Sequence, residues 1–466
     1  MISNQMPNLT LQNIAEACEG RYIGKKEEEY KVICGTVIDS RQVEKDYLFI
    51  AIKGERVDGH NFISQVFEKG AACVLSEQEL ENPAGPYIKV ASTTEAMKKL
   101  AQFYRQGLDI KVVGITGSVG KTSTKEMIAS VVAQKYKVWK TAGNFNNEIG
   151  LPLTIFGIRE EHEVAVLEMG ISDFNEMHRL ATIANPDICV ITNIGLCHLE
   201  NLGSRDGILK AKTECFDHMK AGGVAILNGD DDKLFTQKEV NGRPAVFYGI
   251  GETSWEKSVY ATEVKNLGFE GMKASIHTPS GVMEVHISIP GEHNVYNALA
   301  ATAVGLRLGL GLEEIKKGIE EAKTIAGRTN LMKVGGMHII DDCYNANPVS
   351  MAAALDVLSH ATGRSIAVLG DMGELGENEK ALHFGVGKCV GEKKIHTLFC
   401  AGELAVEYEK GAKSVNPDCD THYFATRGEM EVALKAYAKE GDSILIKASH
   451  FMEFPKVVEK LTEDAE

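Results

Sequence analysis

The 466-residue sequence lacks the features that mark a secreted or a membrane-spanning protein. Its ten cysteines never fall in CxxC spacing, which gives no support to a zinc ribbon or a disulfide framework and indicates a reducing, cytoplasmic compartment. No uninterrupted apolar run reaches the ~20 residues that a spanning helix needs. The N-terminal residues include neither a cationic start nor an apolar segment. We therefore expect a soluble, unprocessed chain. Separately, we expect the protein to be a monomer, although no feature of the sequence determines its oligomeric state.

Positive charge is scarce relative to negative charge. Lys and Arg number 50 against 65 Asp and Glu, so the formal net charge is −15. A field of that sign repels nucleic acid and anionic membrane surfaces, and a phosphate ligand must then be held by local geometry. We expect no nucleic-acid partner and no membrane span. Repeats and low-complexity stretches are also lacking, and a hydrophobic share of 44% is that of a globular protein with real cores.

The length predicts about three domains, at roughly 150 residues each. We predict the α/β fold class, with a small α/β domain over 1–107, a parallel-sheet domain over 108–325 and a doubly wound, Rossmann-like domain over 326–466. From Trp255 to Ile289 the pattern changes to alternating short strands. The other expected strands lie at 47–52, 72–75, 87–90, 111–115, 164–169, 188–192, 224–227, 338–341, 366–370, 398–401 and 443–447, and helices are expected over 94–105, 122–136 and 294–308.

A glycine-rich segment over 114–123 ends one predicted strand and opens a predicted helix. In that setting successive backbone N–H groups and the helix N-terminus can hold phosphates, Lys121 can reach the outer phosphates and Thr122 can hold magnesium. Ile115 stands where a strict P-loop pattern requires its first glycine. The alternative is a glycine-rich turn with a surface lysine, but Gly-x-x-Gly-Lys-Thr between a strand and a helix favours nucleotide binding.

Two side chains near predicted strand ends are candidates for phosphate chemistry, and a lysine on a predicted helix is a third residue to weigh. Glu168 ends one strand and can act as a hard oxygen ligand, or it is simply an exposed strand-end glutamate. His198 follows the next strand and can bind a metal or substrate, or it is a polar surface group. Lys212 lies on a predicted helix, where nothing local distinguishes it from Lys210.

Asparagine and aspartate gather in three further turns. The turn at 141–152 contains Asn144, Asn146 and Asn147, which suit a polar ligand but also serve turns themselves. The segments 341–348 and 370–376 each follow a predicted strand, and we expect these two polar strand ends to lie side by side, where α/β folds bind ligands. Helix capping is the competing explanation for each aspartate.

Taken together, these motifs resemble those of the Mur ligase family. The matching segments occur in order through all three predicted domains, and they are far more specific together than singly. They are 39–41, 48–56, 114–123, 141–152, 193–204, 290–297, 327–328, 341–348, 371–376 and 447–449. His450 departs from the pattern, because close relatives commonly have arginine there. The Asp-Asn-Pro-Arg signature of the member that adds the third peptide residue is absent from the sequence.

The resemblance implies an ATP-dependent amide ligase that joins D-alanyl-D-alanine to UDP-N-acetylmuramoyl-tripeptide through an acyl phosphate, in peptidoglycan synthesis. It implies an N-terminal UDP-sugar domain, a central ATPase domain and a C-terminal domain that closes over the site. The implied cofactors are ATP and two Mg²⁺, with a carbamylated Lys212. The alternatives are another Mur-type ligase, a folylpolyglutamate synthetase, a P-loop switch or kinase, and a non-catalytic UDP-sugar binder.

The resemblance also assigns residues by position. Those implied for catalysis are Lys121, Glu168, His198 and Lys212. The implied metal ligands are Thr122, Glu168, His198 and Lys212. The residues implied for ATP are Thr116, Gly117, Ser118, Val119, Gly120, Lys121, Thr122, Ser123, Asn294, Asn297, Arg328 and Asp342. The residues expected to meet the UDP-sugar, the peptide or the dipeptide are Ser40, Arg41, Lys53, Asn144, Asn146, Asn147, Tyr344, Asn345, Asn347, Asp371, Lys447 and Ser449.

Overall fold

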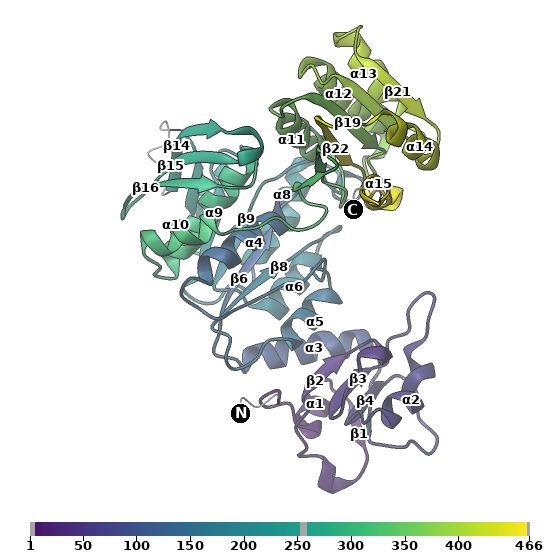
Figure 1. The fold of residues 1–466 in the computed structure, drawn as a ribbon. Helices are drawn as coiled ribbons and strands as arrows, with labels where there is room; N and C mark the ends of the chain where they lie inside the picture. The colour runs from purple at the N-terminus through teal and green to yellow at the C-terminus, as the bar shows by residue number, and fades with distance from the viewer. Residues whose placement is uncertain (1–4, 252–258, 464–466) are drawn as a thin grey trace. The chain divides into compact units, whose positions relative to one another are not determined.

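A computed structural model describes residues 5–251 and 259–463 (Figure 1). The chain divides into two compact units. The first unit takes the chain up to Thr116 together with Tyr136–Cys189 and Thr213–Val224. The second unit takes Gly117–Lys135, Val190–Lys212 and the chain from Ala225 on. The boundary at Thr116 and Gly117 falls inside the predicted phosphate loop, so each unit is described separately.

The first unit begins with a five-stranded sheet in the order β1-β5-β4-β3-β2, in which only β1 runs antiparallel to its neighbour. Phe49, Val74 and Tyr87 from the three inner strands enclose one core with Ile63 and Val66 of the helix α2. The elements are α1 (Leu11–Ala17), β1 (Arg21–Ile23), β2 (Gly35–Val37), β3 (Tyr47–Ile50), α2 (Ile63–Glu68), β4 (Cys73–Ser76) and β5 (Tyr87–Lys89).

The rest of the first unit carries a parallel strand group in which β8 lies between β6 and β7. The strand β8 reads Val-Ala-Val-Leu-Glu and is buried throughout, as expected of a strand covered on both faces. The helix α3 packs against α1, α5 and α6. The elements are α3 (Thr93–Gln106), β6 (Lys111–Thr116), β7 (Val138–Lys140), α5 (Gly150–Phe156), β8 (Val164–Glu168) and α6 (Glu176–Ala184); β9 (Ile188–Ile191) crosses into the second unit.

The second unit opens with α4 (Lys121–Val132), which packs against α9 (His293–Arg307) and α10 (Leu312–Glu320). In this unit β10 and β13 are parallel, and β14, β15 and β16 form an antiparallel meander beside them. The predicted strand region from Trp255 begins outside the described residues, and the meander lies within 259–287. The remaining elements are α7 (Leu199–Leu202), α8 (Arg205–Thr213), β10 (Val224–Asn228), β11 (Glu239–Val240), β12 (Arg243–Pro244), β13 (Val246–Ile250), β14 (Val259–Asn266), β15 (Met272–Thr278) and β16 (Gly281–Ile287).

The C-terminal part of the second unit is a six-stranded sheet in the order β17-β18-β22-β19-β20-β21, parallel except for β17. Residues alternate between two cores, as a period of two requires: Ala367 and Leu369 face the core of α11, α12 and α13, whereas Ile366 and Val368 face that of α14 and α15. The elements are β17 (Asn330–Val334), β18 (Met337–Asp341), α11 (Pro348–Ser359), β19 (Arg364–Gly370), α12 (Glu379–Glu392), β20 (Thr397–Ala401), α13 (Val406–Val415), β21 (Asp420–Phe424), α14 (Arg427–Tyr437), β22 (Asp442–Lys447) and α15 (Pro455–Thr462).

Two expectations from the sequence need correction. The helix after the glycine-rich segment ends at Val132 rather than near residue 136. The strand ends at Asp341 and Gly370 are not side by side, because β22 lies between β18 and β19. The chain returns from β21 through α14 to fill that central place, and a connection of this kind cannot be read from the order of strands along the sequence.

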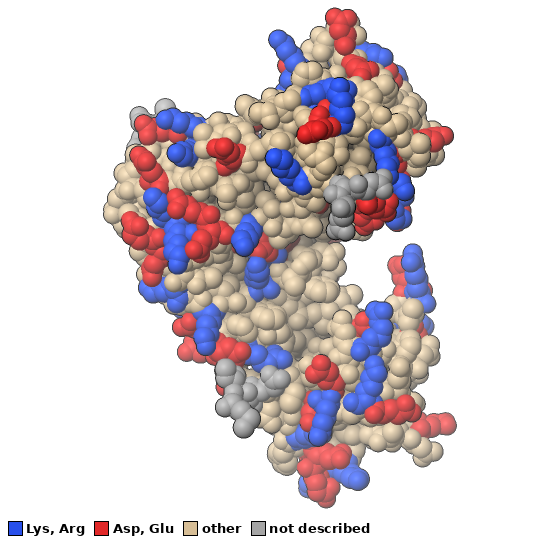
Figure 2. All heavy atoms as spheres, viewed as in Figure 1, with Lys and Arg blue, Asp and Glu red and all other residues tan. Residues whose placement is uncertain are grey.

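Surface charge and helix length bear on the expectation of no nucleic-acid partner and no membrane span. On the face drawn in Figure 2, Lys and Arg side chains are interspersed with Asp and Glu. No helix among the described residues is long and apolar enough to cross a bilayer. All ten cysteines are free thiols, and most of them are buried.

The close packing of α12 on α13 depends on glycine. A Cβ at Gly387 would lie 2.1 Å from the carbonyl oxygen of Tyr408, whereas a Cβ at Gly385, two residues earlier in α12, meets nothing within 4 Å. We expect Gly387→Ala to force the helices apart and to destabilise the C-terminal sheet domain by about 1–3 kcal/mol. Gly385→Ala should be neutral or stabilising by up to about 1 kcal/mol, since alanine favours helix. Thermal unfolding of the two variants checks this, and equal melting temperatures would contradict it.

Candidate active site

The glycine-rich loop has a backbone that only glycine adopts readily. Gly117 follows β6 with φ of 150°, and Gly120 precedes α4 with φ of 80°. A Cβ on Gly117 would lie 1.9 Å from Oγ1 of Thr192, so this position also excludes any side chain by close approach. The loop therefore lies directly against the segment that follows β9.

That segment holds the loop through hydrogen bonds. The backbone N–H groups of Ser118 and Val119 donate to the carbonyl (3.1 Å) and to Oδ1 (3.0 Å) of Asn193. In return, Thr192 Oγ1 donates to the carbonyl of Val119 (2.6 Å), and Gly195 N–H donates to Ser118 Oγ (2.8 Å). Two of the amides that the sequence assigns to phosphate are thus bonded to the protein here, which leaves the loop's helix end for a ligand.

Lysine and cysteine side chains gather beside this loop. Lys121 Nζ donates to the carbonyl of Gly117 (3.0 Å), and Cys197 Sγ donates to the carbonyl of Ser118 (3.2 Å). Burial raises the pKa of the Cys197 thiol, while the charges of Lys121 and Lys212 oppose that rise. Lys212 is buried on α8, whereas Lys210 is exposed on the same helix. The structure therefore distinguishes two lysines that the sequence could not.

In the first unit, Glu168 occupies the end of β8 in register with Ile115 of β6, two residues before the loop. Its Oε1 accepts a hydrogen bond from Asn146 Nδ2 (2.8 Å), and its backbone N–H donates to Thr141 Oγ1 (2.9 Å). The side chain is buried, and Oε2 has no hydrogen-bond partner among the described residues. A buried carboxylate oxygen without a partner is costly unless a cation or donor binds it, so Glu168 fits a metal ligand.

The three asparagines of the turn at 141–152 differ in what they do. Asn146 joins Glu168, as described above. Asn147 accepts hydrogen bonds at Oδ1 from the N–H groups of Ile149 (3.2 Å) and Gly150 (2.8 Å) and so supports the start of α5. Asn144 is exposed. Only Asn146 is therefore placed beside a candidate catalytic group, and Asn147 has the turn role that was the alternative.

The N-terminal candidates lie at the surface of the first unit. Asp39 caps a short 3₁₀ turn, and its pKa falls to about 2 because Arg41 and the Arg41 backbone N–H hydrogen-bond to the carboxylate. Arg41 is 87% exposed and Lys53 is also exposed. The carbonyl of Ser40 accepts a hydrogen bond from Lys69 Nζ (2.8 Å). These positive side chains are accessible to an anionic ligand.

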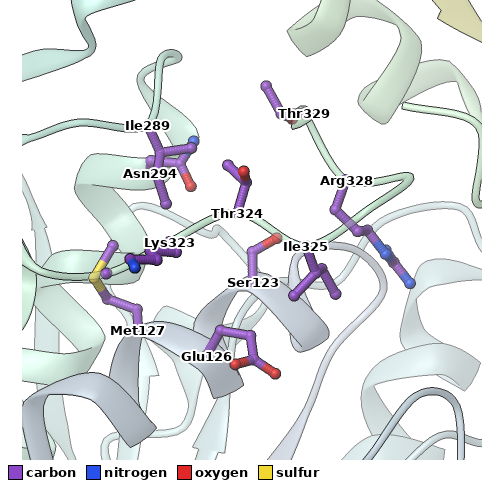
Figure 3. Close-up of a pocket in the computed structure, with 11 residues that line it drawn as sticks. Ser123, Glu126, Met127, Ile289, Asn294, Lys323, Thr324, Ile325, Arg328 and Thr329 are labelled. Atoms are coloured by element: carbon purple, nitrogen blue, oxygen red, sulfur yellow. The ribbon is translucent and has the colours of Figure 1, made fainter. Parts of the chain in front are cut away.

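A small pocket in the second unit brings together residues that lie far apart in the sequence (Figure 3). Ser123 and Glu126 come from α4, Asn294 from α9, and Arg328 from the segment before β17. Its full lining is Ser123, Glu126, Met127, Ile289, Asn294, Ala322, Lys323, Thr324, Ile325, Arg328 and Thr329. Three residues assigned to ATP by the resemblance thus line one pocket at the helix that follows the glycine-rich loop.

A chain of side-chain hydrogen bonds joins α4 to α9 beside this pocket. Thr124 Oγ1 donates to Asn297 Oδ1 (2.7 Å), and Asn297 Nδ2 donates to Asn294 Oδ1 (2.9 Å). Asn294 Nδ2 then donates to the carbonyl of Pro290 (2.8 Å). Both asparagines are buried. Their amides are therefore largely occupied in fixing the helices, so their direct effect is to position the pocket.

The ends of β18 and β22 meet in a buried ion pair. Lys447 Nζ lies 2.6 Å from Asp342 Oδ2 and donates to the carbonyl of Asn345 (3.0 Å). Asp342 Oδ1 accepts the N–H of Thr329, which lines the pocket. These contacts bring Asp342, Asn345 and Lys447 together.

Aromatic stacking holds the neighbouring arginine. The guanidinium of Arg328 lies 3.9 Å from the ring centroid of Tyr344, and His450 meets the same ring edge-on at 6.2 Å. Arg328 Nε is buried and has no hydrogen-bond partner among the described residues. A planar cation held on one face by a ring and unpartnered at one nitrogen is suited to an anionic ligand.

Two contacts join the glycine-rich loop's neighbourhood to the C-terminal sheet domain within the second unit. His198 Nδ1 lies 3.0 Å from Glu374 Oε2, and Asn347 Nδ2 lies 3.4 Å from Cys197 Sγ. Asn347 also caps α11 by accepting the N–H of Ser350 (2.9 Å). His198 is thus paired with a carboxylate, and Asn347 caps α11, a role that the sequence reasoning had not considered for it.

Asp371 and Ser449 occupy the ends of β19 and β22. Ser449 Oγ accepts the N–H of Gly373 (2.8 Å). Asp371 Oδ2 accepts the N–H of Leu404 (3.2 Å) near the start of α13, while Oδ1 is buried and has no partner in the described part of the chain. Burial raises the pKa of the Asp371 carboxyl. Asp371 therefore acts in part as a helix cap, yet keeps one oxygen available for a ligand.

Two further points concern the possible metal ligands and the residues that sequence reasoning did not identify. Among residues 5–251 and 259–463, no group of three or more His, Cys, Asp or Glu is placed to hold a metal ion. Sequence reasoning did not single out Thr192 or Cys197, which contact the glycine-rich loop, or Glu374, which pairs with His198. Their only sequence signal is proximity to a predicted strand end, and many residues share that signal.

Models of the Mur ligase family match the chain in three places. The family's catalytic domain matches residues 32–105, its middle domain matches residues 115–305, and its glutamate ligase domain matches residues 327–450. Together these matches take in most of the chain.

Individual relatives cover nearly the whole chain. The UDP-N-acetylmuramoyl-tripeptide–D-alanyl-D-alanine ligase of Bacillus subtilis is 40% identical over 97% of this chain and 98% of its own length. A crystal structure of MurF from Acinetobacter baumannii superposes with a TM-score of 0.88 at 34% identity, covering 98% of this chain and 99% of that one. MurF ligase from Thermotoga maritima in complex with ADP superposes with a TM-score of 0.80 at 29% identity, covering 92% and 97%.

The buried carboxyl of Asp371 predicts a pH-dependent stability. Because its pKa is raised on folding, its favourable contribution is present below the unfolded pKa and is lost as pH rises through the folded pKa. We expect Asp371→Asn to raise the melting temperature at pH 7 by a few degrees, with a smaller difference near pH 4. Asp442→Asn is the contrast: Asp442 binds Arg364 through both oxygens, so this variant should melt lower at pH 7. A pH-independent effect of Asp371→Asn would contradict the assignment.

Proposed function

Because the chain belongs to the Mur ligase family, we propose that it is the ligase that joins D-alanyl-D-alanine to UDP-N-acetylmuramoyl-tripeptide at the expense of ATP. This reaction is the last cytoplasmic step in making the UDP-linked pentapeptide for peptidoglycan. The observation that carries the proposal is the similarity, over nearly the full length, to ligases of that name. The convergence of Ser123, Asn294 and Arg328 on one pocket supports ATP as the nucleotide.

The nucleotide occupies the start of α4 and the pocket beside it. The helix N-terminus presents unpaired N–H groups and a partial positive charge to the phosphates. Lys121 is the first residue of α4, and its Nζ donates a hydrogen bond to the carbonyl of Gly117 in the loop. Its charge is therefore close to the helix N-terminus. Arg328 and Asn294 line the pocket where the rest of the nucleotide lies. Phosphoryl transfer therefore takes place beside the N-terminus of α4 and Lys121.

The reaction must make a poor electrophile reactive. The peptide carboxylate attacks the γ-phosphorus of ATP, an O–P bond forms, and the bond to ADP breaks. The free amine of D-alanyl-D-alanine then attacks the acyl carbon, phosphate leaves with its bonding electrons, and the amine proton is released. Lys121 and the loop amides stabilise the charge that gathers on the transferring phosphoryl group. The sum is acid, amine and ATP converted to amide, ADP and phosphate.

Mg²⁺ belongs with this chemistry, and we assign it to Thr122, Glu168, His198 and a carbamylated Lys212. Magnesium supplies charge neutralisation and orientation of the phosphates when bound. The buried, unpartnered Oε2 of Glu168 fits a hard cation ligand. Lys212 is buried on α8, and a neutral amine at this position can add to CO₂ and lose one proton to give an anionic carbamate.

The two other substrates are assigned to opposite ends of the chain. Residues 1–107 hold the UDP-sugar through Ser40, Arg41 and Lys53, whose exposure suits an anionic ligand. Residues 326–466 hold the dipeptide and meet the nucleotide through Tyr344, Asn345, Asn347, Asp371, Lys447 and Ser449. Residues 108–325, between them, hold ATP. We propose that the protein acts in the cytoplasm as a monomer, and the ten free cysteines are compatible with that compartment.

An ADP-release assay tests the proposed reaction. The purified chain is given ATP, Mg²⁺ and UDP-N-acetylmuramoyl-tripeptides with either lysine or diaminopimelate at the third position, and D-alanyl-D-alanine or single amino acids as acceptors. We expect ADP and phosphate to appear only when tripeptide and dipeptide are both present. ADP release without an amine acceptor, or a stable phosphorylated product, would indicate a switch or a kinase instead.

Two lysine variants make the assay specific for the site. Lys121→Ala should lower kcat/KM by about 10²–10³-fold, because it removes a cation from the transferring phosphoryl group. Lys317→Ala, on the exposed face of α10, is the control and should leave the rate unchanged. A Lys121→Ala enzyme with full activity would refute the assignment of the loop.

The carbamate has its own test. Lys212→Ala should lose about 10²-fold or more in kcat, and a short carboxylate such as formate should restore part of the rate, because it replaces an anionic metal ligand. Lys210→Ala changes an exposed lysine on the same helix and should behave as wild type with or without formate. Wild-type kinetics in Lys212→Ala would remove the carbamate from the mechanism.

A further inference from the structure

Two imidazole rings face each other at the surface of the first unit, and neither histidine is among the residues assigned to the ligase reaction. His178 lies on α6, and His218 follows a 3₁₀ turn at Glu214–Phe216. Their Nε2 atoms are 3.2 Å apart, and the rings meet edge-on with centroids 4.5 Å apart. Both residues belong to the same unit.

The surrounding contacts fix both rings. His178 Nδ1 lies 2.9 Å from Asp217 Oδ2, so the proton of a neutral His178 is held on Nδ1 and the lone pair is on Nε2. Asn185 Nδ2 donates to the carbonyl of His218 (2.9 Å). Glu214 accepts the backbone N–H of His178 (3.3 Å), which ties α6 to the turn that precedes His218.

We propose that His178 and His218 form a two-histidine site for a divalent transition metal of the Zn²⁺ or Ni²⁺ class. Two nitrogen ligands at metal–nitrogen distances of 2.0–2.1 Å in tetrahedral geometry lie about 3.3 Å apart, close to the spacing of the two Nε2 atoms. A carboxylate behind a metal-binding imidazole, as Asp217 is behind His178, orients such a ligand and raises its basicity.

The remaining ligands come from water. His178 and Asp217 have side chains that are 47% and 49% exposed, so solvent reaches the site. The site has only two histidines, and no third His, Cys, Asp or Glu among the described residues completes a cluster. It therefore binds exchangeably rather than as a closed structural site. Mg²⁺ prefers oxygen ligands and is not expected to compete.

Calorimetric titration of NiCl₂ into the full chain without a polyhistidine tag tests the proposal. We expect one equivalent to bind at pH 7.5. His178→Ala and His218→Ala should each weaken binding by more than about 10-fold, and Asp217→Asn should weaken it by about 10–100-fold. His360→Ala removes an exposed histidine at the end of α11 and should bind like the wild type. MgCl₂ at equal concentration should leave the isotherm unchanged.

Thermal unfolding gives a second readout that does not depend on activity. Ni²⁺ should raise the melting temperature of the wild type and not that of His178→Gln or His218→Gln, whose melting temperatures without metal show that they fold. Ligase activity of these variants should equal that of the wild type, so the outcome is separate from the proposed reaction. The proposal is overturned if the wild type binds no Ni²⁺, or if binding survives in both alanine variants, which would place the metal elsewhere.

Discussion

The fit of the glycine-rich loop against the segment after β9 is the constraint on which the rest of the site depends. Gly117 leaves no space for a Cβ beside Thr192, and Asn193 accepts two successive N–H groups of the loop. This contact fixes the N-terminal end of α4, and Ser123 and Glu126 near that end line the pocket. The same segment continues to Cys197 and His198, which contact Asn347 and Glu374 of the C-terminal sheet domain. The segment after β9 therefore contacts both the glycine-rich loop and the six-stranded C-terminal sheet domain.

The site concentrates polar groups in places where burial is unfavourable. Glu168 and Asp371 each have a buried carboxylate oxygen with no partner among the described residues, and Arg328 has a buried nitrogen in the same condition. Folding alone would favour apolar side chains at such positions, because unsatisfied buried polar atoms cost free energy. Their presence at strand ends and beside a pocket indicates groups that are completed by ligands.

Sequence reasoning succeeded where a residue's role is local. The loop's glycines and the helix after it follow from strand, turn and helix patterns, and Glu168 follows from its place at a strand end. It failed where pairing between distant segments decides. The insertion of β22 between β18 and β19 places Lys447 beside Asp342, an arrangement that depends on the crossover from β21. The sequence also did not indicate that Asn297 accepts a hydrogen bond from Thr124 of α4 and donates one to Asn294.

By itself, the sequence determined the α/β class and predicted a phosphate-binding loop, because these depend on periodicity and on residue types within short segments. Its motifs, taken together, also resemble those of the Mur ligase family. Only the tertiary structure separated Lys212 from Lys210, showed that Asn347 caps α11 and showed that Asn147 supports the turn before α5. It also brought His178 to His218 across forty positions of the chain. Burial and contact arise from the packing of segments that are distant in sequence, and no local pattern encodes them.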